Sequence, residues 1–141
     1  MSWWVSYGQP LIGPASVLAV AVYTQNRTLS RDIRARRASR DKDALSAMID
    51  AAIRLRAAAM VIGRNPTTAT PEQNATFDET RAEFEFRVAA LPFARVATAA
   101  KAWADLSLRF AALDPDVTEA QERSAWTQMV RLAGNEAKDV T

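Results

Sequence analysis

"GRNPTTATPEQ" (residues 63–73) divides the chain and decides how its helices are connected. Gly63 suits the C-terminal cap of one helix, and Pro66 prevents that helix from continuing. Thr70, followed by a proline and then by Gln73, predicts the start of another helix with a capping box. The stretch therefore predicts two helices joined by a short loop, which favours an antiparallel pair.

The sequence before this loop predicts one long helix. From Ala15 to Ile62 there are 48 residues without glycine or proline, and as a single helix they would extend about 72 Å. Toward the end of this stretch, apolar side chains recur at three- and four-residue spacing and predict one apolar face. Its members are Leu45, Met48, Ile49, Ala52, Ile53 and Met60.

The sequence after the loop predicts further helices, over residues 71–91, 93–113 and 118–133. Pro92 ends or kinks the first of them. A turn at residues 114–116 ("DPD") follows the second, and Thr118 with Gln121 forms another capping box. Their predicted apolar faces contain Phe77, Phe84, Val88 and Leu91, then Phe93, Val96, Ala100, Trp103, Leu106 and Phe110, then Trp126, Met129, Val130 and Ala133.

These faces predict a bundle held together by large apolar side chains. We expect the following residues to form the bundle core or an interface with a protein partner: Leu45, Met48, Ile49, Ile53, Phe77, Phe84, Trp103, Phe110 and Trp126. No strand pattern stands out in the sequence. The expected fold class is all-α: an N-terminal membrane helix continues into a long helix and is followed by an antiparallel helical bundle.

The N-terminal segment has the composition of a membrane anchor. From Trp3 to Tyr23 there are 21 uncharged residues, against the roughly 20 apolar residues that a bilayer-spanning helix needs. Aromatic residues stand at both ends, where interfacial anchors are found. The expected anchor residues are Trp3, Trp4, Tyr7, Leu11, Ile12, Val17, Leu18, Val20, Val22 and Tyr23.

Other interpretations of this segment stay open. Only Leu11 to Tyr23 is strongly apolar, and Pro10 and Pro14 interrupt the segment, so it either spans the bilayer or lies in its interface. A buried core helix of a soluble domain is the first alternative. A cleaved signal peptide is the second, although no lysine or arginine precedes the apolar run.

A cluster of arginines follows the predicted anchor directly. Residues 1–40 contain six arginines and one aspartate, a net charge of +5, whereas residues 41–141 carry a net charge of −3. We expect Arg27, Arg31, Arg34, Arg36, Arg37 and Arg40 to contact lipid headgroups. The positive-inside rule then places the N-terminus outside and the C-terminal region in the cytoplasm, at the plasma membrane. A solvated stalk is the alternative, and nucleic-acid binding is the least favoured interpretation.

The expected organisation of the chain follows from these segments. It consists of an N-terminal anchor at 1–26, a basic juxtamembrane stalk at 27–43, a helical bundle at 44–134 and a polar tail at 135–141. Gly134 and Asn135 are expected to stop the last helix, so that the tail frays.

The residue types that carry most enzyme chemistry are missing. The sequence contains neither histidine nor cysteine, which removes the commonest general base, metal ligand and nucleophilic thiol. Glu79 and Glu83 lie one turn apart, but Arg87 follows Glu83 at four residues, which favours a solvated ion pair over a metal site. The sequence therefore predicts no enzymatic activity, no cofactor and no metal.

The layout of the chain resembles short hypothetical proteins of actinobacteria and their phages. The likeness rests on "LIGPASVLAVAVY" (11–23), "RDIRARRASR" (31–40) and the Ala/Arg-rich helices after them. It implies membrane attachment and a mobile-element context, and it carries no site residue.

The function expected from these features is that of a non-enzymatic, membrane-anchored interaction or scaffold protein. Its partners would be membrane lipid, a protein of unknown identity and further copies of itself. One rival is a holin- or toxin-like protein that permeabilises membranes. The other is a soluble helical regulator that binds nucleic acid through its arginine cluster.

Overall fold

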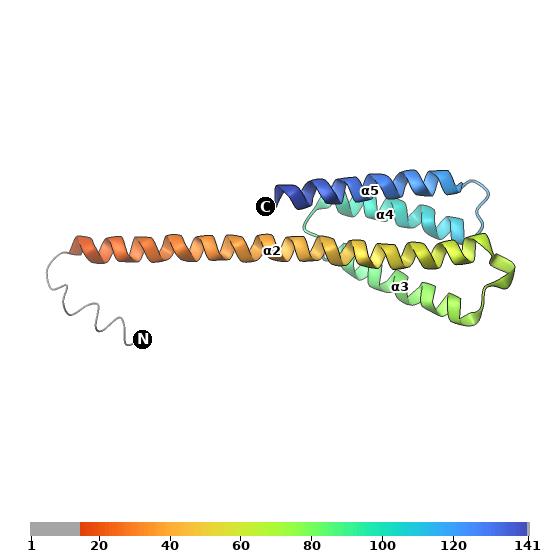
Figure 1. Ribbon diagram of the computed structural model, residues 1–141, viewed down its shortest axis with the longest axis horizontal. Helices are drawn as coiled ribbons and strands as arrows, with labels where there is room; N and C mark the ends of the chain where they lie inside the picture. The colour runs from red at the N-terminus through yellow and green to blue at the C-terminus, as the bar shows by residue number, and fades with distance from the viewer. Residues whose placement is uncertain (1–14, 141) are drawn as a thin grey trace. The chain divides into compact units, whose positions relative to one another are not determined.

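The computed structural model of the protein describes the backbone of residues 15–140 and the side chains of residues 28–140. Every regular element in this part of the chain is helical, which confirms the all-α class. In chain order the elements are α2 (Ala15–Arg64), the short 3-10 helix η1 (Pro66–Thr68), α3 (Pro71–Ala89), α4 (Ala94–Ala111) and α5 (Glu119–Asp139) (Figure 1). The chain divides into two compact units, residues 1–37 and residues 38–141.

The second unit is an antiparallel helical bundle. Successive helices reverse direction (Figure 1). The last part of α2 runs beside α3, to which the Arg54–Glu83 ion pair joins it, and α4 runs beside α5. Helix α2 ends at Arg64, one residue before the loop that contains Pro66. Helix α3 ends at Ala89, before Pro92, because the residue that precedes a proline is driven out of the helical conformation.

Both predicted capping boxes are present and fix where α3 and α5 begin. The Thr70 hydroxyl accepts a hydrogen bond from the Gln73 amide at 3.1 Å, and the Gln73 side chain accepts one from the Thr70 amide at 2.9 Å. Thr118 and Gln121 repeat the arrangement at 3.2 and 2.9 Å. Each box satisfies two amides that would otherwise lack a partner at the helix start.

The core of the bundle lies between all of its helices and centres on Trp103. This side chain is fully buried and meets Phe84 of α3 and Trp126 of α5 edge-on, with ring centroids 5.4 and 5.0 Å apart. The other buried apolar residues of the core are Leu45, Met48, Ala51, Ala52, Leu55, Val88, Val96, Ala100, Met129 and Ala133. Burial of these apolar side chains removes nonpolar area from water and so stabilises the bundle.

The apolar face of α2 differs from the predicted one. Its buried positions are 45, 48, 51, 52, 55 and 59, which lie on one side of the helix. This stripe excludes Ile53, which is 52% exposed. Because each residue turns the helix by about 100°, a stripe centred on Leu55 leaves Ile53 well to one side of it. Ile53 therefore does not belong to the bundle core, and its predicted place in an interface with a protein partner stays a prediction.

The turn between α4 and α5 holds a leucine in a left-handed conformation. Leu113 has a φ of 62°. Its amide donates to the Phe110 carbonyl at 3.1 Å, and the Asp114 amide donates to the Arg109 carbonyl at 2.9 Å. These two bonds form the motif that closes many helices, in a position that usually holds glycine.

Helix α5 continues beyond the predicted stop. It runs through Gly134 and Asn135 to Asp139, so residues 135–139 are helical and the predicted frayed tail is wrong for them. Ala133 is buried and Ala137 packs against the core. Packing on both sides of Gly134 outweighs the helix penalty of one glycine, which is about 1 kcal/mol.

Candidate functional site

The predicted anchor lies outside the part of the chain whose side chains are described. This applies to Trp3, Trp4, Tyr7, Leu11, Ile12, Val17, Leu18, Val20, Val22 and Tyr23, and to the side chain of Arg27. In the part of the chain that the structure describes, no helix combines the length and the apolar character needed to cross a bilayer. Membrane attachment therefore stays a prediction.

The arginine cluster on α2 is exposed on every side of the helix. The side chains of all its described members are exposed, namely those of Arg31, Arg34, Arg36, Arg37 and Arg40. Within residues 28–140, none of these guanidinium groups lies within ion-pair distance of a carboxylate. The cluster is consequently available to an external anion.

Two apolar side chains lie among these arginines. Leu29 is 58% exposed and Ile33 is 56% exposed. They are four residues apart and so share one face of α2.

The predicted core and interface residues occupy three environments. Leu45, Met48, Phe84 and Trp103 are buried. Ile49, Phe77 and Trp126 are partly buried and pack against the core, and Phe110 is also partly buried. Only Ile53 of this set is exposed.

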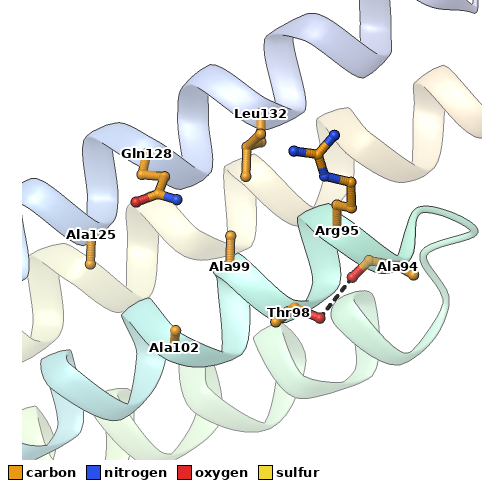
Figure 2. A pocket seen from close by; sticks show the side chains of 8 residues that line it. All are labelled: Ala94, Arg95, Thr98, Ala99, Ala102, Ala125, Gln128 and Leu132. Atoms are coloured by element: carbon orange, nitrogen blue, oxygen red, sulfur yellow. Dashed lines mark hydrogen bonds between the residues drawn. The ribbon is translucent and has the colours of Figure 1, made fainter.

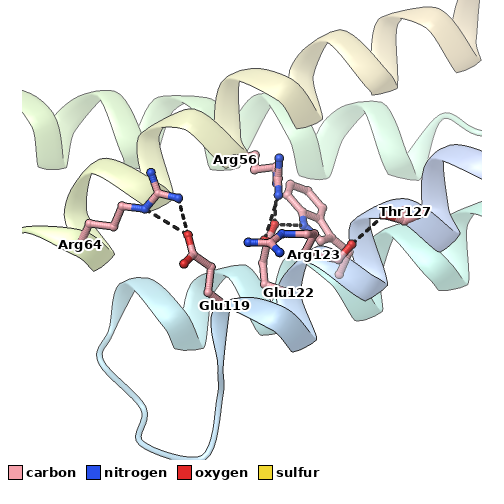
Figure 3. A network of polar contacts seen from close by, with 7 residues as sticks. Arg56, Arg64, Glu119, Glu122, Arg123 and Thr127 are labelled. Carbon is pink, nitrogen blue, oxygen red and sulfur yellow. Dashed lines mark hydrogen bonds and ion pairs between the residues drawn. The ribbon is translucent and has the colours of Figure 1, made fainter.

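A buried carboxylate forms the polar centre of the bundle (Figure 3). Glu122 of α5 is fully buried. One of its carboxylate oxygens accepts hydrogen bonds from Arg56 Nε at 2.7 Å and from Trp103 Nε1 at 2.8 Å. The other accepts from Arg56 Nη2 at 3.2 Å. The three residues link α2, α4 and α5 through one charged group.

The electrostatics of this centre are balanced. The Arg56 side chain is 31% exposed, and its guanidinium carbon lies 5.0 Å from the centre of the Trp126 ring, a cation–π distance. Both Glu122 oxygens have donors, so the buried charge is paired and hydrogen-bonded as burial requires. Such an arrangement holds the helices in position. Both carboxylate oxygens already accept hydrogen bonds within the protein, so neither is left free to bind a substrate.

Sequence reasoning missed this centre because charged residues were assigned to the surface. A signal for it exists: Glu122, Trp126, Met129 and Ala133 follow one another at spacings of four, three and four residues. That spacing places Glu122 on the buried face of α5. A lone carboxylate on an apolar face predicts a buried cation partner.

Two ion pairs at the surface lower carboxylate pKa values. The hydrogen bond from Arg64 and its charge lower the pKa of Glu119 below 4.5; the Arg64 Nε–Glu119 distance is 3.1 Å. Arg109, which donates to Asp114 at 2.8 Å, and the amide of Asp116 lower the pKa of Asp114 below 3.8. The Glu119 pair joins α2 to α5 near the loops of the bundle (Figure 3).

The carboxylates of α3 form no metal site. Glu83 pairs with Arg54 of α2 at 2.6 Å, and not with Arg87 as the sequence predicts. Arg54 lies on the side of α2 that faces α3, so the contact between helices replaces the contact within one. Among the described residues, no group of three or more potential ligands could hold a metal ion.

A groove lies between α4 and α5 (Figure 2). Its volume is about 460 Å³. The groove is lined by the short side chains of Ala99, Ala102 and Ala125 and by the longer ones of Arg95, Gln128 and Leu132 (Figure 2). A second depression of about 380 Å³ lies on α5, shares Gln128 with the groove, and contains Arg123 and Arg131.

Comparison with protein-family models, with curated proteins and with solved structures finds no match for this chain.

Proposed function

We propose that the protein is a non-enzymatic, membrane-attached helical scaffold that acts through protein contacts. The observation that carries the proposal is the arginine cluster, whose five described side chains are exposed and form no ion pair with a carboxylate in residues 28–140. An arginine near an anionic bilayer contributes about 1 kcal/mol to binding. Charge on all sides of a helix beside an apolar segment suits a juxtamembrane collar.

Leu29 and Ile33 support the same proposal. Both apolar side chains are exposed among the arginines, where their contact with water does not stabilise the protein. At a bilayer surface, apolar side chains of this kind enter the boundary between headgroups and acyl chains while neighbouring basic side chains bind phosphate.

The bundle supports a scaffold more than an enzyme. Its one fully buried carboxylate is occupied by Arg56 and Trp103. The groove between α4 and α5 is lined mainly by alanines and contains no carboxylate among its lining residues.

A fractionation with matched lysine substitutions tests membrane attachment. Val17→Lys with Val20→Lys places two charges in the predicted anchor, each of which opposes insertion by about 2.5–3.5 kcal/mol. We expect the full-length chain to sediment with membranes and resist carbonate extraction, and the double variant to be released. The matched control is Ile53→Lys with Ala57→Lys, at two exposed positions of α2, and it should sediment like the unaltered chain.

The binding of the arginine cluster to lipid is tested separately with anionic vesicles. Arg31→Gln, Arg36→Gln and Arg40→Gln together should weaken binding of the full-length chain to phosphatidylglycerol vesicles relative to phosphatidylcholine vesicles. The control removes the same charge from exposed positions of the bundle, at Arg54, Arg81 and Lys101, and should bind both kinds of vesicle like the unaltered chain.

Three results would overturn the proposal. The first is a full-length chain that stays dissolved and monodisperse without detergent. The second is collapse of membrane potential on expression, which would make the protein a permeabilising one. The third is salt-dependent DNA binding that is lost in the triple arginine-to-glutamine variant, which would make nucleic acid the partner of the arginine cluster.

A further inference from the structure

The outer face of α3 presents an aromatic side chain to solvent. Phe86 is 68% exposed, the largest value among the exposed large apolar side chains of the described residues. Glu72 and Glu79 precede it at intervals of seven residues, which is two helical turns, so the three share one face. Ala75 and Ala82 lie between them and are exposed as well.

The two carboxylates on this face are not engaged elsewhere. Within the described residues, neither Glu72 nor Glu79 forms an ion pair. The face therefore consists of a phenylalanine and small methyl groups beside these two carboxylates, and the Arg87 guanidinium carbon lies 5.8 Å from the centre of the Phe86 ring. We refer to Glu72, Ala75, Glu79, Ala82 and Phe86 as the acidic face.

The groove between α4 and α5 has the opposite character. None of the residues that line it or the adjoining depression on α5 is acidic. Arg95 and Arg131 are exposed and form no ion pair in the part of the chain that the structure describes. Ala99, Ala102 and Ala125 leave room above the two backbones (Figure 2). We refer to this surface as the basic groove.

We propose that the acidic face of one copy of the chain docks in the basic groove of a second copy. Phe86 would occupy the space above the alanines, and Glu72 and Glu79 would approach Arg95 and Arg131. Alanine floors permit helices to approach closely, and aromatic side chains in such depressions dominate interface energies.

One copy cannot fill its own groove. Phe84 and Val88 are buried in the core and hold α3 in place, so Phe86 points away from the bundle. The contact also joins two different surfaces, unlike the self-complementary contact of a two-fold dimer. Each added copy therefore leaves one acidic face and one basic groove open, which produces rings or extended assemblies.

This inference rests on the proposed scaffold function and names its protein partner. Confinement to a bilayer raises the local concentration of copies, so a contact of modest affinity suffices for assembly.

The first test is removal of the aromatic side chain. Phe86→Ala in the full-length chain, in mild non-ionic detergent, should raise the dissociation constant of self-association by about 30-fold, measured by sedimentation velocity over a concentration series. The matched control is Ile53→Ala, another exposed apolar residue on a helix, which should leave that constant unchanged. Unchanged far-UV circular dichroism shows that each variant is folded.

The decisive test exchanges the charges. One variant carries Glu72→Arg and Glu79→Arg, so its face and groove are both basic; the other carries Arg95→Glu and Arg131→Glu, so both are acidic. Each alone should lose self-association. A mixture should associate again, because each face then meets an oppositely charged groove.

The inference is overturned if the unaltered chain is monomeric at every concentration, if the charge variants associate normally alone, or if their mixture stays monomeric. Membrane sedimentation of the same variants is measured in parallel. If the variants lose self-association but still sediment with membranes, the proposal of membrane attachment is unaffected. If the chain self-associates but does not sediment with membranes, membrane attachment is overturned and the docking contact is not.

Discussion

Replacement of Arg56 by methionine should destabilise the bundle more than any surface charge change. Glu122 is fully buried and has three donors, two of them on Arg56 and one on Trp103. Arg56→Met leaves the carboxylate in the core with the indole as its one remaining donor. Breaking a buried ion pair in this way costs about 3–5 kcal/mol.

Two further variants separate the charge from the shape. Glu122→Gln keeps an oxygen for the Trp103 donor but loses the charge that strengthens the Arg56 bonds, at a cost of about 1.5–3 kcal/mol. Arg56→Met combined with Glu122→Met removes both charges and leaves only the indole N–H without an acceptor, which costs about 1–3 kcal/mol. The double variant should therefore be more stable than Arg56→Met alone.

The control is the exposed pair between Arg54 and Glu83, whose side chains are 53% and 40% exposed. Arg54→Met should cost about 0.2–1 kcal/mol, because water screens and replaces this contact. Urea unfolding of the full-length variants in one detergent, followed by circular dichroism, gives the free energies from the midpoints and slopes. Equal losses for Arg54→Met and Arg56→Met, or additive losses in the Arg56–Glu122 double variant, would refute the reasoning.

Further predictions concern glycine positions, a buried hydroxyl and pH. Gly134→Ala should stabilise the bundle by about 0.5–1 kcal/mol, because nothing lies within 4 Å of the added carbon. Gly63→Ala should destabilise the bundle by about 1–3 kcal/mol, because its added carbon would lie 2.6 Å from Phe110 Cδ1. The midpoints of urea unfolding compare the two variants. Ser107→Ala should stabilise by about 1 kcal/mol in the same assay, because the buried hydroxyl has no hydrogen-bond partner among the described residues. The lowered pKa of Glu119 adds stability that is present above pH 4.5 and lost as the pH falls through the lowered value, so melting temperatures of Glu119→Gln should fall less steeply below pH 4.5 than those of the unaltered chain.

Each of these expectations has a contrary outcome. Equal effects at the two glycines would show that Phe110 moves aside freely. A less stable Ser107→Ala variant would mean that the hydroxyl has a partner. Glu79→Gln is the pH control, since Glu79 forms no ion pair within the described residues, and a slope change as large as that of Glu119→Gln would contradict the role of Arg64.

The helix boundaries were largely predictable because they depend on local chemistry. Capping boxes, prolines and the loop at residues 63–73 act within a few residues, and the structure places helix ends close to each of them. The exception is Gly134. A local stop signal there is overridden by packing of Ala133 and Ala137, which depends on the neighbouring helices.

The facing of helices and the polar centre were harder to predict because they depend on contacts between distant residues. Apolar residues lie on two sides of α2, and only the position of the other helices decides that Leu55 is buried and Ile53 exposed. In the same way, Asp50 is the carboxylate closer to Arg54 in sequence, but Arg54 pairs with Glu83 of another helix. The anchor residues before Thr28 remain a prediction from composition.

The buried charge of Glu122 also limits how the helices can slide. Alanine is abundant on the packed faces, and smooth surfaces of this kind would fit one another in more than one register. A shift of one turn moves a helix by about 5.4 Å, which would carry Glu122 out of hydrogen-bonding reach of Arg56, Trp103 or both. In any other register a buried carboxylate would therefore lose hydrogen-bond donors. Contacts among these three side chains thus favour one alignment of α2, α4 and α5 over the others.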